Sequence, residues 1–354
     1  MKLFIAKLHY KRELSSFESI IRSILSFFSF FYAIVVNIRN FFYDRNIFKS
    51  YKSQAYTISI GNITTGGVGK TPVTAEIANY YTGQKKRVAI LSRGYGAALN
   101  NSKPNIISNG NEVYYESDEA GDEPVWLAHN CTNTAVITCT SRVSAAKMAE
   151  EKFNAEVLIL DDGFQHRKMD RDLNLLLIDN NNKFGNELVL PAGPLRENLE
   201  NIKRADKLIL VNKSYYDESS IKYCQELEKR FKKRVHLCKM VPDYIYNIVT
   251  NTRLDKNSEI LAFCAIGQPQ EFYEFLKSDY RLAVTVDFED HHSYDESNLQ
   301  DLIDIAKTEG VTKLVTTEKD AVKLKDILLK CKPDIDIYAM KLKAYLDIED
   351  ICNV

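Results

Sequence analysis

The sequence lacks several features that would indicate common classes of protein. Its 47 Lys and Arg residues nearly balance 48 Asp and Glu residues, which leaves a formal net charge of −1. A chain this close to neutral has no overall field that would recruit a polyanion, so we expect no nucleic-acid partner. The seven cysteines include no C-x-x-C pair. This spacing argues against a disulfide framework and against a zinc site.

The chain also contains no internal repeat and no low-complexity linker. Its 354 residues are enough for two domains of ordinary size, each with a core of its own. A hydrophobic content of 45% and a charged content of 27% are typical of a globular protein. Nothing in the sequence indicates an obligatory protein partner.

Residues 17–43 are rich in Phe, Ile and Val, but they lack an uncharged stretch long enough to span a bilayer. The uncharged run between Arg22 and Arg39 has 16 residues, whereas a spanning helix needs about 20. Residues 1–52 contain nine Lys or Arg and three Asp or Glu, a local charge of 9 − 3 = +6. On a helical wheel a wide apolar face adjoins a narrow polar stripe, formed by Ser19, Arg22, Ser23, Ser26, Ser29, Ala33 and Asn37.

These properties predict a peripheral or monotopic helix that lies in one leaflet, with the basic flank favouring an anionic cytoplasmic surface. A buried core helix and a membrane-spanning helix are the open alternatives. A cleaved signal peptide is disfavoured, because no clear small-residue cleavage site follows the segment.

Residues 61–72, Gly-Asn-Ile-Thr-Thr-Gly-Gly-Val-Gly-Lys-Thr-Pro, follow a β-branched run at 56–60 and precede a helical pattern that ends near Tyr81. A glycine-rich loop between a strand and a helix brings backbone N–H groups and the positive helix end to phosphate oxygens. We expect Lys70 at the terminal phosphates and Thr71 on Mg²⁺. An ordinary glycine-rich turn is the alternative. The predicted nucleotide contacts are Thr64, Thr65, Gly66, Gly67, Val68, Gly69, Lys70 and Thr71.

After this loop, strand-like runs alternate with helical ones, which is typical of a parallel sheet covered by helices on both faces. The fold class is therefore α/β, with a P-loop NTPase-like sheet. The strand-like runs are 87–93, 134–140, 156–160, 173–179 and 205–211, and then, after a charged stretch at 217–234, 260–266, 283–288, 313–317 and 336–340. We predict a membrane-associated region over 1–50, the nucleotide-binding domain over 51–230, and a smaller second α/β domain with hinge strands over 231–354.

Asp161 and Asp162 directly follow the strand-like run at 156–160. Acidic residues at the carboxyl edge of a parallel sheet lie beside the phosphate loop and can hold Mg²⁺ directly or through water. Paired Asp residues alone are equally typical of a turn or a helix cap. Together with the Gly-Lys-Thr loop they predict a metal site.

Several further motifs follow along the chain in a recognisable order. One of them, G-D-E-P, is expected in a loop between elements. The set resembles the tetraacyldisaccharide 4′-kinase family, the lipid A kinases of the Gram-negative inner membrane, over nearly the whole chain. It follows a basic, apolar N-terminus and consists of G-N-x-x-x-G-G-x-G-K-T-P (61–72), R-G-Y-G (93–96), G-D-E-P (121–124), D-D-G-F-Q-H (161–166), L-P-A-G-P-L-R-E (190–197), F-x-D-H-H (288–292) and T-E-K-D-A-V-K-L (317–324). The general phosphate-loop pattern begins with Gly at the position of Thr64, and this family tolerates another residue there.

The resemblance implies transfer of the γ-phosphate of ATP, with Mg²⁺, to the 4′-hydroxyl of a tetraacyldisaccharide 1-phosphate, giving lipid IVA. The partner would be this glycolipid, at the cytoplasmic face of the bacterial inner membrane. A membrane-associated P-loop ATPase switch without a lipid acceptor is the rival function. The acid and imidazole motifs favour the kinase, because a switch needs no base for an acceptor.

Residue roles also follow from the resemblance. It makes Asp122 and His291 a general-base pair, with His292 as the competing imidazole, and gives Glu197 a functional acidic role. It assigns Lys70 to the phosphates. The implied metal ligands are Thr71, Asp161 and Asp162.

Overall fold

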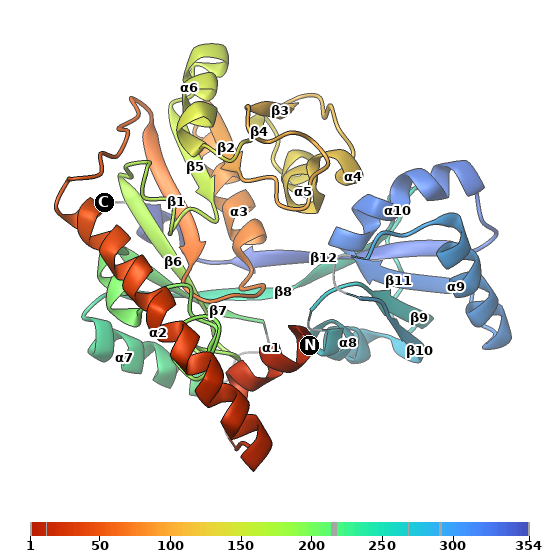
Figure 1. Ribbon diagram of the computed structural model, residues 1–354. Coiled ribbons are helices and arrows are strands. Elements are labelled where there is room, and N and C mark those ends of the chain that lie inside the picture. The colour runs from red at the N-terminus through yellow and green to blue at the C-terminus, as the bar shows by residue number, and fades with distance from the viewer. Residues whose placement is uncertain (1, 12, 214–217, 268, 290–291, 353–354) are drawn as a thin grey trace.

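The computed structural model describes residues 2–11, 13–213, 218–267, 269–289 and 292–352. Within these residues twelve strands form one sheet, in the order β10-β9-β11-β12-β8-β7-β6-β1-β5-β2-β4-β3 (Figure 1). The strands are β1 Tyr56–Asn62, β2 Val88–Ser92, β3 Asn105–Asn109, β4 Thr134–Thr138, β5 Val157–Asp161, β6 Leu173–Asp179, β7 Lys207–Asn212, β8 Val235–Asn247, β9 Glu259–Cys264, β10 Arg281–Asp287, β11 Lys313–Thr317 and β12 Asp336–Tyr345.

The strands around β1 are parallel, as the sequence predicts. Ile58 of β1 pairs with Ile159 of β5 on one side and with Leu173 of β6 on the other. These three strands are nearly continuous apolar runs because both of their faces are buried. The carboxyl ends of β1 and β5 therefore meet at one edge, where β1 leads into the phosphate loop.

Helices cover both faces of this half of the sheet. Val157 and Ile159 pack in the core under α3 (Lys70–Gly83) and α5 (Asp122–Asn130), whereas Leu158 and Leu160 pack in the core under α6 (Arg142–Phe153). Alternate residues of one strand thus enter different cores. The other helices of this half are α4 Ser117–Ala120, the 3₁₀ helix η1 Leu199–Arg204 and α7 Glu218–Phe231, and α11 Ile348–Cys352 packs against α3.

A long antiparallel pair, β8 and β12, joins the two halves of the sheet. Their register runs from Tyr338 opposite Asn247 to Tyr345 opposite Lys239. The start of β8 pairs with β7, and β12 pairs with β11. The far half carries α8 Pro269–Asp279, α9 Glu296–Thr308 and α10 Glu318–Cys331, with cores on both faces. We call residues 51–234 the first unit and residues 248–335 the second unit; the predicted domain boundaries stay predictions.

One sequence expectation differs from the structure. The G-D-E-P motif does not lie in a loop, because Asp122 begins α5. Acidic residues in a first helical turn suit the positive end of the helix dipole, and Pro is tolerated there. The charged stretch 217–234 contains α7, whose buried Leu227 marks the apolar side of a mostly charged helix.

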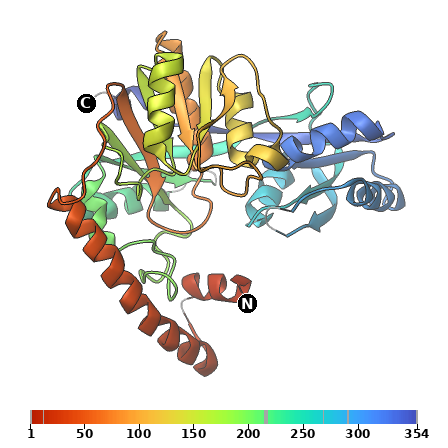
Figure 2. The same ribbon diagram turned by 45° about the horizontal axis from the view of Figure 1, so that its top comes forward.

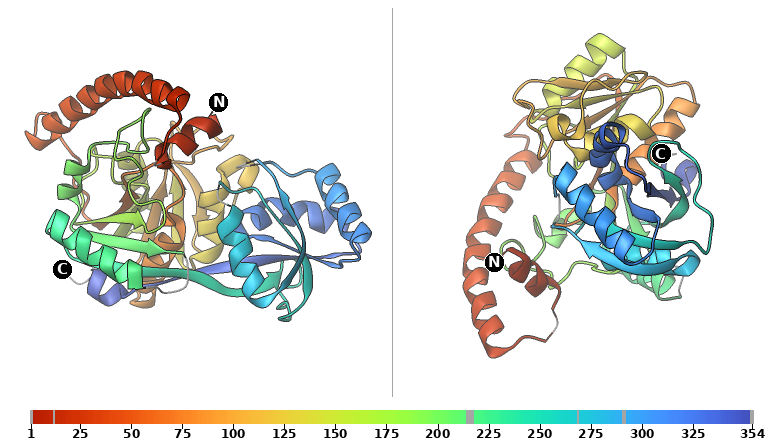
Figure 3. Two further views of the ribbon diagram at one scale, coloured as in Figure 1. Left: turned by 90° about the horizontal axis from the view of Figure 1, so that it is seen from below. Right: turned by 90° about the vertical axis from the view of Figure 1, so that its right-hand side faces the viewer.

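The N-terminal segment forms two helices, α1 (Lys2–Tyr10) and α2 (Ser16–Asp44). A capping box of Ser15 and Glu18 begins α2. In the described residues α2 is the one helix that is long and apolar enough to cross a membrane by length and composition. Its exposed large apolar residues are Phe17, Ile20, Ile24, Phe27, Phe28, Phe30, Phe31, Ile34, Val35, Ile38 and Phe41. This exposure contradicts the core-helix alternative, and Figures 2 and 3 show α2 at the periphery of the molecule.

Candidate active site

The phosphate loop has the predicted strand–loop–helix form. The loop follows Asn62, the last residue of β1, and α3 begins with Lys70, Thr71 and Pro72. Gly69 immediately before α3 has a φ of +92°, and a Cβ there would lie 2.5 Å from the Met240 side chain. The positive φ therefore favours glycine at this position, whereas the Met240 methyl is the end of a flexible side chain that could move.

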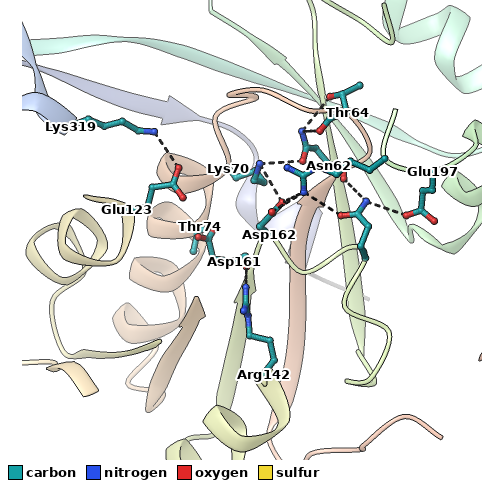
Figure 4. Close-up of polar contacts among 12 residues, drawn as sticks. Asn62, Thr64, Lys70, Thr74, Glu123, Arg142, Asp161, Asp162, Glu197 and Lys319 are labelled. Atoms are coloured by element: carbon teal, nitrogen blue, oxygen red, sulfur yellow. Dashed lines mark hydrogen bonds and ion pairs between the residues drawn. The ribbon is translucent and has the colours of Figure 1, made fainter. Parts of the chain in front are cut away.

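Lys70 is held at the N-terminal end of α3 by two acceptors. Its Nζ donates to Asn62 Oδ1 at 3.2 Å and lies 3.4 Å from Asp162 Oδ1 (Figure 4). Thr71 beside it is buried. The arrangement places an ammonium and free helical N–H groups where terminal phosphates would bind. Asn62 is not among the site residues predicted from the sequence, although it stands in the G-N-x-x-x-G-G motif.

The two carboxylates among the predicted metal ligands, Asp161 and Asp162, are adjacent in sequence but electrostatically different. Burial raises the pKa of Asp161 to about 7, and the carboxylates of Glu123 and Asp162 add to this effect. Burial also works against the charged form of Asp162. Lys70 and Arg196 outweigh it, however, and lower the pKa of Asp162 to about 2. Arg196 Nη1 donates to both oxygens of Asp162, at 3.0 and 2.8 Å.

This donor set fits Mg²⁺. A buried carboxylate that binds a proton readily gains more from a nearby cation than one already compensated by a guanidinium. Mg²⁺ takes oxygen ligands, commonly one or two carboxylates together with waters and substrate phosphates. In the described part of the chain no group of three or more His, Cys, Asp or Glu could hold a metal ion. Thr71, Asp161 and Asp162 thus remain proposed ligands that would share the ion with phosphate oxygens.

Glu197, predicted as a functional acid, is fully buried in a polar cluster. Arg204 donates to both of its oxygens, at 2.9 and 2.8 Å. Gln165 Nε2 donates to Glu197 Oε1 at 3.1 Å, and to the carbonyl of Asn62 at 2.9 Å. Asn40 of α2 donates to Glu197 Oε2 at 2.9 Å. Glu197 thus connects α2 to the end of β1, and its catalytic role stays a prediction.

Thr64 and Thr65 pair with the L-P-A-G-P-L-R-E segment. The N–H of Thr65 donates to the Pro194 carbonyl at 2.8 Å, and Thr64 forms a β-bridge with Leu195. The Tyr10 hydroxyl of α1 donates to the Thr65 carbonyl at 3.4 Å. The loop entry is thus fixed by backbone contacts with neighbouring segments. Binding of nucleotide by Thr64 and Thr65 stays a prediction.

Asp122 lies at the start of α5 and faces the second unit. Lys323 of α10 lies 3.0 Å from Asp122 Oδ2. His291, the predicted partner of Asp122, lies outside the described residues. The ring of the rival, His292, stacks on Phe288 with centroids 4.8 Å apart, and its Nε2 lies 2.9 Å from Asn298 Oδ1. These contacts anchor the His292 ring, and the choice of His291 as the working imidazole stays a prediction.

Lys213 lies at the phosphate loop, although it is not among the site residues predicted from the sequence. It follows β7 at the carboxyl edge of the sheet, and its Nζ donates to the carbonyl of Gly67 in the phosphate loop at 2.8 Å. The same ammonium lies 2.9 Å from Asp179 Oδ2 and 3.4 Å from Glu271 Oε2 of α8. Burial lowers the pKa of Lys213, but the two carboxylates outweigh it, so the pKa is raised. The available signal was a lysine directly after a buried strand.

We expect Lys213→Met to raise KM for ATP by about 10-fold, because a lost contact to the Gly67 carbonyl is worth about 1–1.5 kcal/mol. It should also lower the free energy of unfolding by about 3 kcal/mol, since it leaves the buried Asp179 carboxylate without its cation. Steady-state kinetics and denaturant titration measure the two effects. Lys222→Met, at an exposed lysine of α7, is the matched control. Unchanged KM in Lys213→Met would show that this contact does not shape the loop.

Comparisons with known proteins show the family to which the chain is similar. A family model described as Tetraacyldisaccharide-1-P 4'-kinase, LpxK, matches residues 21–353. The tetraacyldisaccharide 4'-kinase of Halothermothrix orenii is 31% identical over 358 residues, which cover 95% of this chain and 93% of that protein. The enzyme of the same name from Geobacter metallireducens is 37% identical over 312 residues, covering 88% of this chain and 91% of that protein.

A solved structure is also similar over nearly the full length. The crystal structure of LpxK from Aquifex aeolicus in complex with ATP matches with a TM-score of 0.73 and 29% identity, covering 93% of this chain and 96% of that one. The matches span the phosphate loop, the Asp pair and both units. This chain therefore belongs to the tetraacyldisaccharide 4′-kinase family.

Proposed function

We propose that this chain is a kinase that transfers the γ-phosphate of ATP to the 4′-hydroxyl of tetraacyldisaccharide 1-phosphate, giving lipid IVA. The observation that carries the proposal is the meeting of Lys70 with the Asp161–Asp162 pair at one sheet edge. That arrangement provides a phosphate-binding loop with an acidic metal site beside it. Family membership supplies the acceptor, because the relatives are named for this substrate.

In this mechanism Lys70 and the N-terminal N–H groups of α3 bind the β- and γ-phosphates. Bound Mg²⁺ would neutralise charge on the phosphates, held through Thr71 and the Asp pair. Asp122 accepts the proton of the 4′-hydroxyl as its oxygen bonds to the γ-phosphorus. The bond from that phosphorus to the β-phosphate oxygen breaks, and ADP leaves. Asp122 and Lys70 come from helices α5 and α3, which pack on the same face of the sheet.

The position of α2 supports binding at the cytoplasmic leaflet of the inner membrane. Its polar side contacts the protein: Ser29 donates to the Val189 carbonyl at 2.9 Å, and Tyr32 donates to the Arg196 carbonyl at 2.8 Å. Asn40 and Asp44, further along the helix, bond Glu197 and Arg167. Because these contacts extend along the helix, its apolar side faces outward over the same length. Such a helix suits insertion into one leaflet beside a lipid substrate.

One assay separates this proposal from the rival ATPase switch. Protein, ATP, Mg²⁺ and a detergent-dispersed tetraacyldisaccharide 1-phosphate are incubated, and both ADP and phosphorylated lipid are measured. The kinase produces them in equal amounts, and a substrate lacking the 4′-hydroxyl gives no phosphorylated lipid. ADP formed without phosphorylated lipid would identify the switch instead.

We expect serine at three exposed apolar positions of α2 to release the protein from anionic vesicles, lowering its vesicle affinity by about 10²-fold. The three changes are Phe27→Ser, Phe31→Ser and Val35→Ser, at side chains exposed by 63%, 52% and 67%. Co-sedimentation with vesicles measures the effect. Point changes are preferable to deletion of α2, because deletion would also remove the bond from Asn40 to Glu197.

The matched control carries serine at three exposed apolar positions outside α2: Val249, Leu329 and Tyr345, exposed by 50%, 48% and 47%. This variant should bind vesicles as the unaltered chain does. Equal release of both triple variants would mean that α2 has no special role in membrane binding.

A further inference from the structure

The two units meet where α10 of the second unit faces the first turn of α5. Lys319 Nζ lies 3.2 Å from Glu123 Oε1 (Figure 4), and Lys323 Nζ lies 3.0 Å from Asp122 Oδ2. Because the lysines are four positions apart, they lie on the same face of α10. Trp126, one turn further along α5, is buried at this contact, where Val322 of α10 packs against the same core.

The two lysine–carboxylate pairs differ in exposure. The Lys319 and Glu123 side chains are both 40% exposed, and pairs of this kind contribute little because water and salt screen them. The Lys323 and Asp122 side chains are only 11% and 16% exposed. Their interaction is screened less. Lys323 therefore restrains the Asp122 carboxylate more strongly than Lys319 restrains that of Glu123.

Lys323 has a second partner in the segment that follows β10. Its Nζ donates to the carbonyl of His292 at 3.0 Å. An ammonium has three donors, so one group can bond both acceptors. The His292 ring is itself anchored to Phe288 and Asn298. Lys323 thereby connects the start of α5 to an anchored residue of the second unit, His292.

We propose that Lys323 is a positioning residue that holds the Asp122 carboxylate, relative to His292, in the orientation that receives the acceptor's proton. The inference rests on the proposed function, because it requires Asp122 to act as the base. Proton transfer needs a base fixed within hydrogen-bond reach of the hydroxyl. Lys323 itself touches neither substrate in this role. Its effect is therefore expected in kcat, with little change in ATP binding.

The test compares Lys323→Met with Lys325→Met, which removes an exposed lysine from the same helix. We expect Lys323→Met to lower kcat for lipid phosphorylation by about 10²-fold, the loss that misplacement by about 1 Å can cause. KM for ATP should change by less than about 3-fold, because the phosphate loop is untouched. Lys325→Met should match the unaltered chain. Lys323→Arg, which keeps a cation with several donors, should recover most of kcat.

A double variant distinguishes positioning from a general structural effect. In an Asp122→Asn background Lys323→Met should cost less than about 3-fold further, because the carboxylate it positions is gone. A full additional loss would show that Lys323 acts elsewhere. If Lys323→Met does not fold, Lys323→Gln replaces it with the same expected results.

The outcomes separate this inference from the proposed function. Normal kcat in folded Lys323→Met, with an active unaltered chain, overturns the inference and leaves the kinase standing. An unaltered chain that phosphorylates no lipid overturns the proposed function, and the inference falls with it.

Discussion

Lys70→Ala is expected to lower kcat/KM for lipid phosphorylation by at least about 10³-fold, the scale of loss when a cation that stabilises the transferring phosphoryl group is removed. The fold should remain, because Asp162 keeps its two hydrogen bonds from Arg196 after the ammonium is gone. Asn62 also retains a partner, since its amide donates to the Thr64 carbonyl. Coupled measurement of ADP and phosphorylated lipid gives the activity, and thermal unfolding gives the stability.

Lys103→Ala, at an exposed loop lysine, is the control for loss of one positive charge and should leave both quantities unchanged. Near-normal turnover in folded Lys70→Ala would show that phosphate binds elsewhere. A large loss of stability together with activity would instead assign Lys70 a structural role between β1 and β5.

The second large effect is expected at the predicted dyad. Asp122→Asn should lower kcat by about 10²- to 10⁴-fold, the usual contribution of a positioned general base. His291→Ala is expected to cost a similar factor if this imidazole orients the carboxylate and shares the developing charge. The double variant should then be little worse than either single one, because the two residues act as a unit. Kinetics at saturating ATP and lipid measure all three.

His292→Ala is the matched histidine control. Its ring packs on Phe288 and Tyr294, so the change should mainly lower stability, by about 1–3 kcal/mol. Multiplied losses in the Asp122 and His291 double variant would disprove the dyad without affecting the kinase assignment. A larger loss of kcat in His292→Ala than in His291→Ala would reverse the roles of the two imidazoles.

The sequence predicts elements best where burial is uniform along the chain. The run 173–179 coincides with β6, and the run 313–317 coincides with β11. β8 was not predicted because Pro242 and Asp243 interrupt its pattern. The structure accommodates the missing N–H of Pro242 where the register with β12 shifts, between Lys341 and Leu342. Residues 235–247 form a strand because they pair with β12, which is distant in sequence.

The candidate site shows the same limit. Motifs locate Lys70, Asp161 and Asp162, because a phosphate loop and an acidic strand end have local patterns. The environment of Glu197 has no such pattern, since its partners Arg204, Gln165 and Asn40 come from separate segments. A sequence alone therefore identifies an acidic residue there. It does not reveal that a guanidinium and two amides already occupy the carboxylate.

The burial of Trp126 between α5 and α10 has a spectroscopic consequence. It is the only tryptophan in the chain, so all indole emission comes from the contact between the units. Any displacement of α10 relative to α5 changes the surroundings of this buried indole and admits water beside the ring. The emission maximum of a more hydrated indole moves to longer wavelength. The unaltered, unlabelled protein thus carries an optical probe of the relative movement of its units, usable in stopped-flow mixing with ATP and lipid.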